Sequence, residues 1–358
     1  MSLTFVTEPV RVRAPATSAN LGPGFDALGL ALALYDDVTA RVAPAGCRVR
    51  VTGEGAEELP GDDTHLVVRA MRATFDVLGG QPRGLVVECV NRIPQARGLG
   101  SSSAAIVAGV LLARALVRDG ERLLDEAATL RLAARLEGHP DNVAPCLLGG
   151  FTIAWTEGER TAARPEGERA AGVAGAAGAA VAPVTEGTVG TPAVSLASPA
   201  GAAGARAVSL APAAGVRPVV FVPVERGLTA HARAALPASV PHPDAARNAG
   251  RAALLVHALT AAPGLLYPAT EDHLHQRYRA AGMPGTYALV TALRTEGVAA
   301  VVSGAGPTVL ALSELPEGFE PGMGWTALPL PIDVNGARVY GGRLGHAERD
   351  PVAAGRKS

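Results

Sequence analysis

Residues 94–105 read PQARGLGSSSAA, and this string sets the first expectation for the chain. Gly98 and Gly100 permit a tight turn whose backbone N–H groups can point at one centre. The serines that follow open the strongest helical pattern of the sequence, residues 101–117. The start of a helix carries partial positive charge and free N–H donors, so it suits a polyphosphate. The string predicts a phosphate-binding turn. It is neither a Walker A loop nor a GxGxxG dinucleotide turn after a strand.

Further segments place polar side chains in glycine- and proline-rich surroundings, where loops commonly present functional groups. Residues 15–29 read PATSANLGPGFDALG, residues 137–145 read EGHPDNVAP before Gly149 and Gly150, and residues 303–308 read SGAGPT between two expected strands. Residues 229–233 read TAHAR, with the order T-x-x-x-R spanning Thr229 and Arg233, which share one face if the segment is helical.

Together, these strings resemble the GHMP kinase superfamily, and the segments at 15–29 and 137–145 resemble its homoserine kinase branch. The superfamily's phosphate loop, P-x-x-x-G-L-G-S-S-A, stands at 94–103 almost letter for letter, with one extra serine. The resemblance covers about residues 1–156 and 215–315, in motif order. It implies an α+β fold, the GHMP kinase fold. The N-terminal domain would be like domain 2 of ribosomal protein S5 and the C-terminal domain ferredoxin-like, with the active site between them.

The resemblance also implies an activity, which is transfer of the ATP γ-phosphoryl group to the hydroxyl of L-homoserine in threonine biosynthesis. Ser102 and Glu137 would bind Mg²⁺, a hard cation that takes oxygen ligands. Asp26 is the natural partner of an amino group, and two arginines suit one carboxylate. The residues implied to bind the substrate are Asn20, Asp26, His139, Asn142, Thr229, Arg233 and Arg279. Those implied to bind ATP are Pro94, Gln95, Ala96, Arg97, Gly98, Leu99, Gly100, Ser101, Ser102, Ser103 and Ala104.

The group that handles the hydroxyl proton is left open by the sequence. Some relatives are thought to use an aspartate in the segment that matches residues 139–142, and this chain has Asp141 and Asn142 there. The role can fall on either or neither. An amide cannot act as a useful base near neutral pH, yet it can orient a hydroxyl. A loose transition state keeps the proton on the hydroxyl until late. We therefore expect Asn142 to be the catalytic residue, orienting the hydroxyl, with Asp141 serving local structure. Relatives often carry Asn where His65 stands, near the adenine, so His65 is not assigned to the site.

Patterning divides the chain into an N-terminal part (1–157), an insertion (158–212) and a C-terminal part (213–345). The resemblance implies that the first is the ATP-binding domain of a GHMP kinase and the last its C-terminal domain. Between 170 and 205 the sequence consists of Ala, Gly, Val, Pro, Ser and Thr apart from Leu196 and Glu186, and it has no aromatic residue. Such a composition buries too little surface to offset ordering, so we expect a disordered insertion. The expected strands are 9–13, 38–52, 84–90, 151–155, 217–224, 297–302 and 308–312. The expected helices are 65–78, 101–117, 123–136, 229–235, 244–259 and 285–296.

Composition argues against other classes of protein. The net charge is −1 and no long basic run appears, which argues against nucleic acid or an anionic membrane as partner. No apolar run reaches the ~18 residues of a membrane span. The cysteines Cys47, Cys89 and Cys146 form no CxxC pair and read as reduced thiols of a cytoplasmic protein. A homodimer is common in the family. The rivals are a mevalonate or shikimate kinase, which would not need Asp26, and a non-catalytic member, which would not need Glu137.

Overall fold

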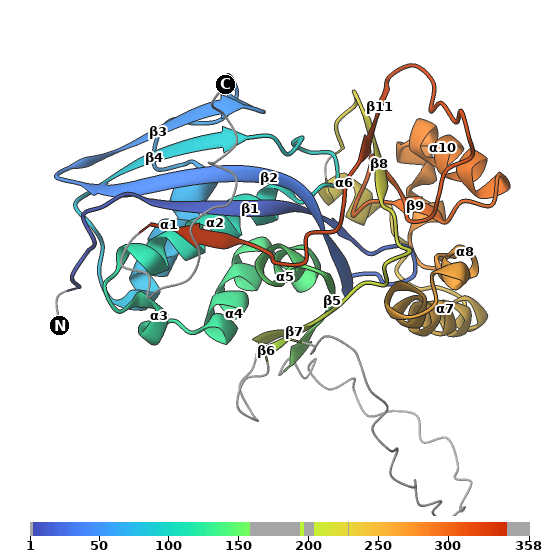
Figure 1. The fold of residues 1–358 in the computed structure, drawn as a ribbon, viewed down its shortest axis with the longest axis horizontal. Coiled ribbons are helices and arrows are strands. Elements are labelled where there is room, and N and C mark those ends of the chain that lie inside the picture. The colour runs from blue at the N-terminus through green and yellow to red at the C-terminus, as the bar shows by residue number, and fades with distance from the viewer. Residues whose placement is uncertain (1–2, 158–193, 197–203, 228, 342–358) are drawn as a thin grey trace, which may run out of the picture.

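The computed structural model describes residues 3–157, 194–196, 204–227 and 229–341. Its elements form two parts, each built on its own sheet (Figure 1). An eight-stranded sheet with helices comes mainly from the N-terminal half, and a four-stranded sheet with helices comes from the C-terminal half. This mixed architecture confirms the α+β expectation.

The N-terminal sheet is organised around β2 (Leu28–Ala43), its longest strand. On one side β2 pairs antiparallel with β1 (Val10–Ala19). On the other side its two ends take different partners, β4 (Gly84–Asn91) at residues 37–43 and β5 (Phe151–Glu157) at residues 28–30. Between these partners Asp36 Oδ1 accepts the backbone N–H groups of Arg92 and Ile93, at 2.6 and 2.9 Å. The segment leading to residues 94–105 is therefore fastened at the middle of β2.

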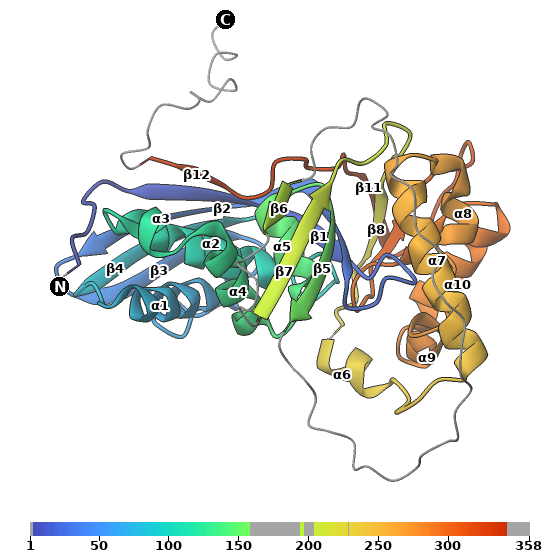
Figure 2. The ribbon, with the colours of Figure 1, turned by 90° about the horizontal axis from the view of Figure 1, so that it is seen from below.

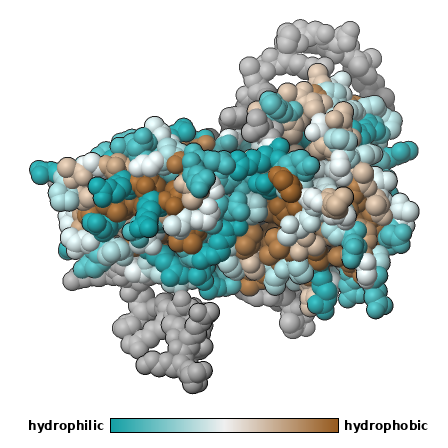
Figure 3. All heavy atoms as spheres, turned by 90° about the horizontal axis from the view of Figure 1, so that it is seen from above, coloured by the Kyte–Doolittle hydropathy of each residue, from teal (hydrophilic) through white to brown (hydrophobic). Residues whose placement is uncertain are grey.

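Helices cover one face of this sheet (Figure 2). They are α1 (Leu66–Leu78), α2 (Ser101–Leu116), α3 (Gly120–Leu123), α4 (Glu126–Glu137) and α5 (Pro140–Leu148). The α2 helix is buried along most of its length, as its small and aliphatic residues predict. The other face, seen in Figure 3, is mostly hydrophilic with hydrophobic patches, and β3 (Gly46–Gly53) and β4 expose Arg48, Arg50 and Glu88 there. The sheet is therefore buried on one side only.

The C-terminal sheet consists of β8 (Val219–Pro223), β9 (Ala300–Val302), β10 (Val309–Ala311) and β11 (Trp325–Pro329) in the order β11-β8-β10-β9, all antiparallel. That order, fourth-first-third-second along the chain, is ferredoxin-like, although the described residues 312–324 between β10 and β11 form no helix. The helices of this part are α6 (Thr229–Ala234), α7 (His242–Thr260), α8 (Leu266–Ala269), α9 (Gln276–Arg279) and α10 (Pro284–Thr295), with 3-10 turns at 263–265 and 280–282. None of the described helices is both long and apolar enough to cross a membrane.

The structure corrects two of the expected boundaries. Residues 204–210 form β7, which pairs with β5, and residues 194–196 form β6, which pairs with β7. The insertion expected to be disordered through 212 is therefore wrong at its C-terminal end, because Ala205 and Ala207 pack into the N-terminal core. Its remainder, 158–193 and 197–203, lies outside the described residues. The last strand, β12 (Arg338–Tyr340), pairs with β1, so the end of the expected C-terminal domain returns to the N-terminal sheet.

Local expectations were also incomplete. The stretch 38–52 is not one strand but the end of β2 and most of β3, separated by a turn at residues 44–45. Half of the expected loop at 15–29 belongs to strands, since β1 continues to Ala19 and β2 starts at Leu28. The α5 helix was not expected, because Pro145 inside it argues against a helix. The other expected helices and strands are present, with ends that differ by a few residues.

Candidate active site

A cavity of about 380 Å³ lies where the two parts meet, and both contribute to its wall. The glycine-rich string 94–105 contributes seven residues to this wall. The residues of the N-terminal part that line it are Asn20, Asp26, Asp36, Val38, Leu59, His65, Leu66, Val67, Asn91, Gln95, Ala96, Gly98, Gly100, Ser101, Ser102, Ala105, Glu137, His139, Asp141 and Asn142. Those of the C-terminal part are Gly227, Thr229, Arg233, Arg279, Gly304 and Ala305. The cavity therefore draws together all the strings that the sequence singled out.

The phosphate loop has the backbone that its glycines predict. Gly98 and Gly100 have φ of +75° and +69°, and Gly100 is the N-cap of α2. A Cβ on Gly98 would meet Ser303 O at 2.3 Å, and one on Gly100 would meet Thr17 Oγ1 at 1.9 Å. No side chain caps the start of α2, so its first N–H groups are available to an anion. Glycine is thus required for both conformation and space.

Contacts with neighbouring segments hold this loop. Thr17 N donates to Leu99 O at 3.0 Å, and Ser303 Oγ donates to Gly98 O at 2.6 Å. The Arg97 side chain lies away from the cavity and donates to the carbonyls of Pro223 and Val224 at 2.9 and 2.8 Å. The loop therefore also joins the two parts of the molecule.

A carboxylate and two hydroxyls converge at the start of α2. Ser102 Oγ and Ser103 Oγ donate to Glu137 Oε1 at 2.6 and 2.9 Å. These are the hard oxygen donors that Mg²⁺ prefers, and they stand beside the expected phosphate position. Within the described ranges, no group of three or more His, Cys, Asp or Glu side chains could hold a metal. A cation here would therefore have to take further oxygen atoms from a bound phosphate or from water.

A pair of opposite charges occupies the other end of the cavity. Arg233 on α6 donates to both oxygens of Asp26, each at 2.9 Å. The hydrogen bonds with Asp26 raise the pKa of Arg233 further. Both side chains are more than a third exposed, so the pair adds little to stability. Its geometry is that of a guanidinium fork on a carboxylate, and either member can exchange its partner for a charged ligand.

Asn20 supports this end of the cavity through its own amide. Its Oδ1 accepts the Asp26 backbone N–H at 2.9 Å and its Nδ2 donates to Gly304 O at 2.8 Å. Asn20 and Asp26 both have positive φ, of 68° and 55°. In this arrangement Asn20 lines the cavity but uses its amide to shape the turn that presents Asp26.

Arg279 is the deeper of the two cavity arginines, with only 3% of its surface exposed. Its Nε donates to Ala232 O at 3.0 Å, and its Nη1 lies 3.2 Å from His275 Nδ1. The guanidinium carbon lies 5.4 Å from the centre of the Phe25 ring. Burial, and after it the charge of Arg233, lowers the pKa of Arg279. These contacts hold the Arg279 guanidinium in place. Because a buried positive charge is costly without a counter-charge, this group would be stabilised by an anionic ligand.

The segment 139–142 brings three polar side chains to the middle of the cavity. Asp141 is buried, and its Oδ1 lies 2.5 Å from His139 Nδ1. This hydrogen bond raises the pKa of His139 above its ordinary value, against the effect of burial. Asn142 Oδ1 accepts from Thr17 Oγ1 at 2.8 Å. Asp141 is therefore committed to His139, and Thr17 orients the Asn142 amide.

Most, but not all, of the residues predicted for the site line the cavity. Every residue predicted to bind the substrate does so, including Thr229 on α6. Within the phosphate loop, Leu99 and Ala104 are buried in the core and Ser103 is buried against Glu137. Pro94 and Arg97, like these three, are not among the wall residues of the described chain. They shape the loop without facing the cavity.

Two titratable wall residues, Asp36 and His65, were given no role from the sequence. Asp36 is buried, and burial raises its pKa to about 6. His65 is buried as the N-cap of α1, its Nδ1 accepts the Val67 N–H, and burial lowers its pKa. Both line the cavity, as do the apolar residues Val38, Leu59 and Leu66. No spacing in the sequence marks Asp36, whereas His65 stands at the start of an expected helix.

Known proteins resemble this chain over nearly its whole length. The family profile described as GHMP kinases N terminal domain matches residues 65–150. A homoserine kinase of Streptomyces avermitilis is 52% identical over 339 residues, 94% of this chain and 97% of the relative. A homoserine kinase of Clavibacter michiganensis is 46% identical over 345 residues, 92% of this chain and 93% of the relative. The crystal structure of homoserine kinase from Cytophaga hutchinsonii superposes with a TM-score of 0.69 at 24% identity, covering 95% of this chain and 100% of that one.

Proposed function

This chain belongs to the homoserine kinase family of the GHMP kinases, and we propose that it transfers the γ-phosphoryl group of ATP to the hydroxyl of L-homoserine. One observation supports this proposal above the others. The wall of one cavity carries a glycine-rich loop suited to an anion and, at what we call the amino-acid end, the Asp26 carboxylate with the guanidinium groups of Arg233 and Arg279. An α-amino acid carries the complementary pair of charges, so its hydroxyl would be held beside the loop.

The amino-acid end would work by exchange of ion pairs. The α-ammonium of homoserine would take Asp26 from Arg233, and the α-carboxylate would then be held by Arg233 and Arg279. Because the net number of charges is unchanged, this exchange needs no group to change its protonation. The interaction with two fixed guanidiniums would orient the side-chain hydroxyl towards the phosphates.

The phosphate end would act through its backbone. The N–H groups at the start of α2 would bind phosphate oxygens, and the turn at Gly98 and Gly100 allows the close approach. Glu137 and Ser102 would hold Mg²⁺, a proposal supported by their hard oxygen donors. When bound, this ion neutralises negative charge on the transferring phosphoryl group.

The hydroxyl proton requires little help from the protein. We propose that Asn142, oriented by Thr17, holds the hydroxyl by a hydrogen bond. Asp141 is engaged by His139 and is 2% exposed, which supports a role in local structure for this carboxylate. The proton would then leave late, towards the phosphoryl oxygens.

The cellular location and the partners of the enzyme are further proposals. We propose a cytoplasmic location, supported by the free thiols Cys47, Cys89 and Cys146. A homodimer stays a prediction from the family resemblance, and the absence of a nucleic-acid partner stays a prediction from the net charge of −1.

A coupled assay of ADP release with L-homoserine, mevalonate, shikimate and galactose tests the proposed function. We expect L-homoserine to be turned over far ahead of the other three alcohols, because only it carries an ammonium group for Asp26. Equal or faster turnover of mevalonate would contradict the assignment of the substrate.

A further inference from the structure

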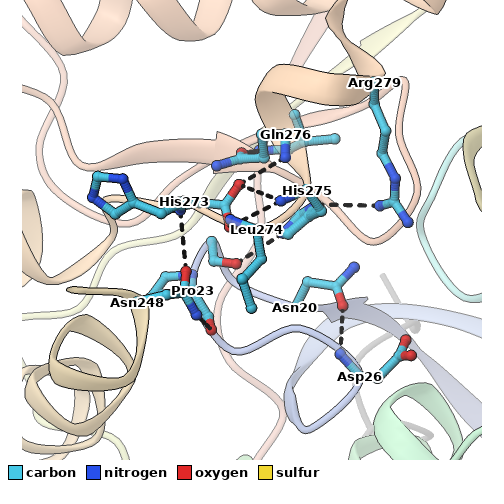
Figure 4. A network of polar contacts seen from close by, with 12 residues as sticks. Asn20, Pro23, Asp26, Asn248, His273, Leu274, His275, Gln276 and Arg279 are labelled. Carbon is cyan, nitrogen blue, oxygen red and sulfur yellow. Dashed lines mark hydrogen bonds and ion pairs between the residues drawn. The ribbon is translucent and has the colours of Figure 1, made fainter. Parts of the chain in front are cut away.

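His275 lies behind the amino-acid end of the cavity and is fully buried. It is not among the residues that line the cavity, and Arg279 is the residue of this segment that the sequence resemblance assigned to the site. Figure 4 shows its ring between the loop that carries Asn20 and Asp26 and the side chain of Arg279. A buried polar ring at this position needs partners on both of its nitrogens.

The partners of the ring define its tautomer. His275 Nε2 lies 2.8 Å from Gly22 O, and a carbonyl oxygen only accepts, so Nε2 carries the proton. Arg279 Nη1 lies 3.2 Å from Nδ1, and a guanidinium only donates, so Nδ1 presents a lone pair. Both contacts are satisfied only by the neutral Nε2–H imidazole.

The surroundings favour the same form. Burial lowers the pKa of His275, and the charge of Arg279 acts in the same direction, while Asp272 and Asp26 oppose it. The Asp272 carboxylate lies 3.7 Å from Nε2 but is occupied by backbone N–H groups of Leu274 at 2.9 Å and Gln276 at 2.7 Å. These hydrogen bonds fix the turn that carries His275 (Figure 4).

The same ring contacts both halves of the amino-acid site. Gly22 and Asp26 belong to one loop, and Gly22 is held tightly there, because a Cβ on it would meet Thr270 O at 2.6 Å. Phe25 of this loop lies with its ring centre 5.1 Å from that of His275 and 5.4 Å from the Arg279 guanidinium. A shift of the ring would therefore displace the ammonium-binding loop and the carboxylate-binding arginine together.

We propose that His275 is a positioning residue that couples the two halves of the amino-acid site, donating to Gly22 O and accepting from Arg279. The inference rests on the proposed function, in which Asp26 and Arg279 bind the opposite ends of one substrate. It assigns a role in the reaction to a side chain that does not touch the substrate.

Two variants separate the two contacts of the ring. In His275→Gln the amide nitrogen can reach Gly22 O, but the acceptor for Arg279 is lost. In His275→Asn the amide oxygen can accept from Arg279, but the bond to Gly22 is lost. We expect each to raise the KM for homoserine roughly tenfold, because a buried partner loses its hydrogen bond, and to leave the KM for ATP within about twofold. His273→Asn is the matched control, since this neighbour pairs with Glu271.

Coupling to Arg279 is tested by combining changes. In the double variant Arg279→Leu/His275→Gln, the KM for homoserine should be little higher than in Arg279→Leu alone. The arginine whose hydrogen bond His275→Gln removes is already absent there. Additive losses, or equal losses for ATP and homoserine, would show that His275 only supports the fold and would overturn the proposal.

The tautomer can be measured without turnover. ¹⁵N–¹H correlation spectra of histidine-labelled protein should show His275 as the neutral Nε2–H form at neutral pH, with an Nδ1 shift that changes in Arg279→Leu. An Nδ1–H or doubly protonated ring would contradict the inference, even if the wild-type protein failed to phosphorylate homoserine. Failure of the proposed function would instead appear as absent turnover by a protein with the expected tautomer.

Discussion

The phosphate end and the amino-acid end of the cavity are built by different means. The proposed phosphate end comes mainly from one continuous string, residues 98–103, and it offers backbone N–H groups and hydroxyls at the start of α2. The amino-acid end is assembled from side chains far apart in the sequence, since Asp26 and Arg233 are 207 positions apart. The first depends on local backbone conformation, whereas the second depends on how the two parts of the molecule are placed.

This difference predicts how each end fails when it is altered. Backbone geometry at the phosphate end has no substitute, so a single added methyl group should be severe. At the amino-acid end, Arg233 and Arg279 would share the substrate carboxylate. Removal of one of them should therefore weaken homoserine binding and leave ATP binding unchanged. Each prediction below tests one side of this contrast, from the largest expected effect to the smallest.

Gly100→Ala should abolish most activity. Its Cβ would stand 1.9 Å from Thr17 Oγ1 at a backbone φ of +69°, so the loop or Thr17 has to move. Thr17 also orients Asn142, which ties the loop to the hydroxyl-binding amide. We expect kcat/KM for ATP to fall roughly a hundredfold or more. Gly250→Ala on α7 is the control, because a Cβ there meets nothing within 4 Å. Near-normal activity of Gly100→Ala would mean that the loop does not bind phosphate through this backbone.

Asn142→Leu and Asp141→Asn separate orientation of the hydroxyl from general-base catalysis. A general base typically contributes ~10²–10⁴-fold to the rate, so Asp141→Asn should cost much less than this in kcat if Asp141 is structural. Asn142→Leu should cost more, and mainly in kcat. A folded Asp141→Asn variant that loses activity about a thousandfold with unchanged homoserine KM would identify Asp141 as the base.

Arg279→Leu should raise the KM for homoserine and leave that for ATP almost unchanged, with some loss of kcat if the substrate tilts. Truncating a buried charge contact typically costs about 2–5 kcal/mol, so a rise of at least tenfold is expected. Arg277→Leu is the matched control two residues away. Arg277 lies on the exposed side of α9 and pairs with Asp244 of α7, outside the cavity. A defect confined to ATP would place Arg279 at the other end of the cavity.

The pH dependence of stability should show a small effect from His139. Its pKa is raised in the folded protein by the hydrogen bond to Asp141, so the folded state binds the proton more tightly than the unfolded state. The resulting stabilisation is complete below about pH 6.5 and is lost as pH rises through the folded pKa. Asp36, His65 and His275 titrate alike in wild type and in His139→Gln, so the difference between the unfolding free energies of the two proteins isolates His139. Urea unfolding across pH 5.5–8.5 should show the stability advantage of the wild type falling as pH rises. An advantage that rises with pH would reverse the sign and reject the pair.

The contrast between the phosphate end and the amino-acid end also explains which site residues could be predicted from the sequence. The phosphate loop, Glu137 and the cavity residues of the substrate end were found because each lies in a string with a recognisable order. The role of Asn20 in shaping the turn was not found from the sequence, because it depends on a hydrogen bond to Gly304, 284 positions away. His275 gave no signal, since its partners Gly22 and Arg279 meet it only in the folded protein.

The fold was predictable to a similar degree. Periodicity predicted α1, α2 and α4, whose buried stripes are local features of the sequence. It missed α5, where the surrounding helices and strands override Pro145, and β7, whose Ala- and Gly-rich sequence is ordered by pairing with β5. Elements stabilised mainly by tertiary contacts leave a weak local pattern.

The most direct test of the account compares L-homoserine with 4-hydroxybutyrate, which keeps the hydroxyl and the carboxylate but lacks the ammonium group. The ratio of their kcat/KM values should be large in the wild type and should collapse in Asp26→Asn, because that variant loses the charge that recognises the ammonium. The KM for ATP should stay nearly constant throughout. Equal use of the two alcohols by the wild-type enzyme, or a ratio unchanged in Asp26→Asn, would contradict the claim that this end of the cavity recognises a zwitterion.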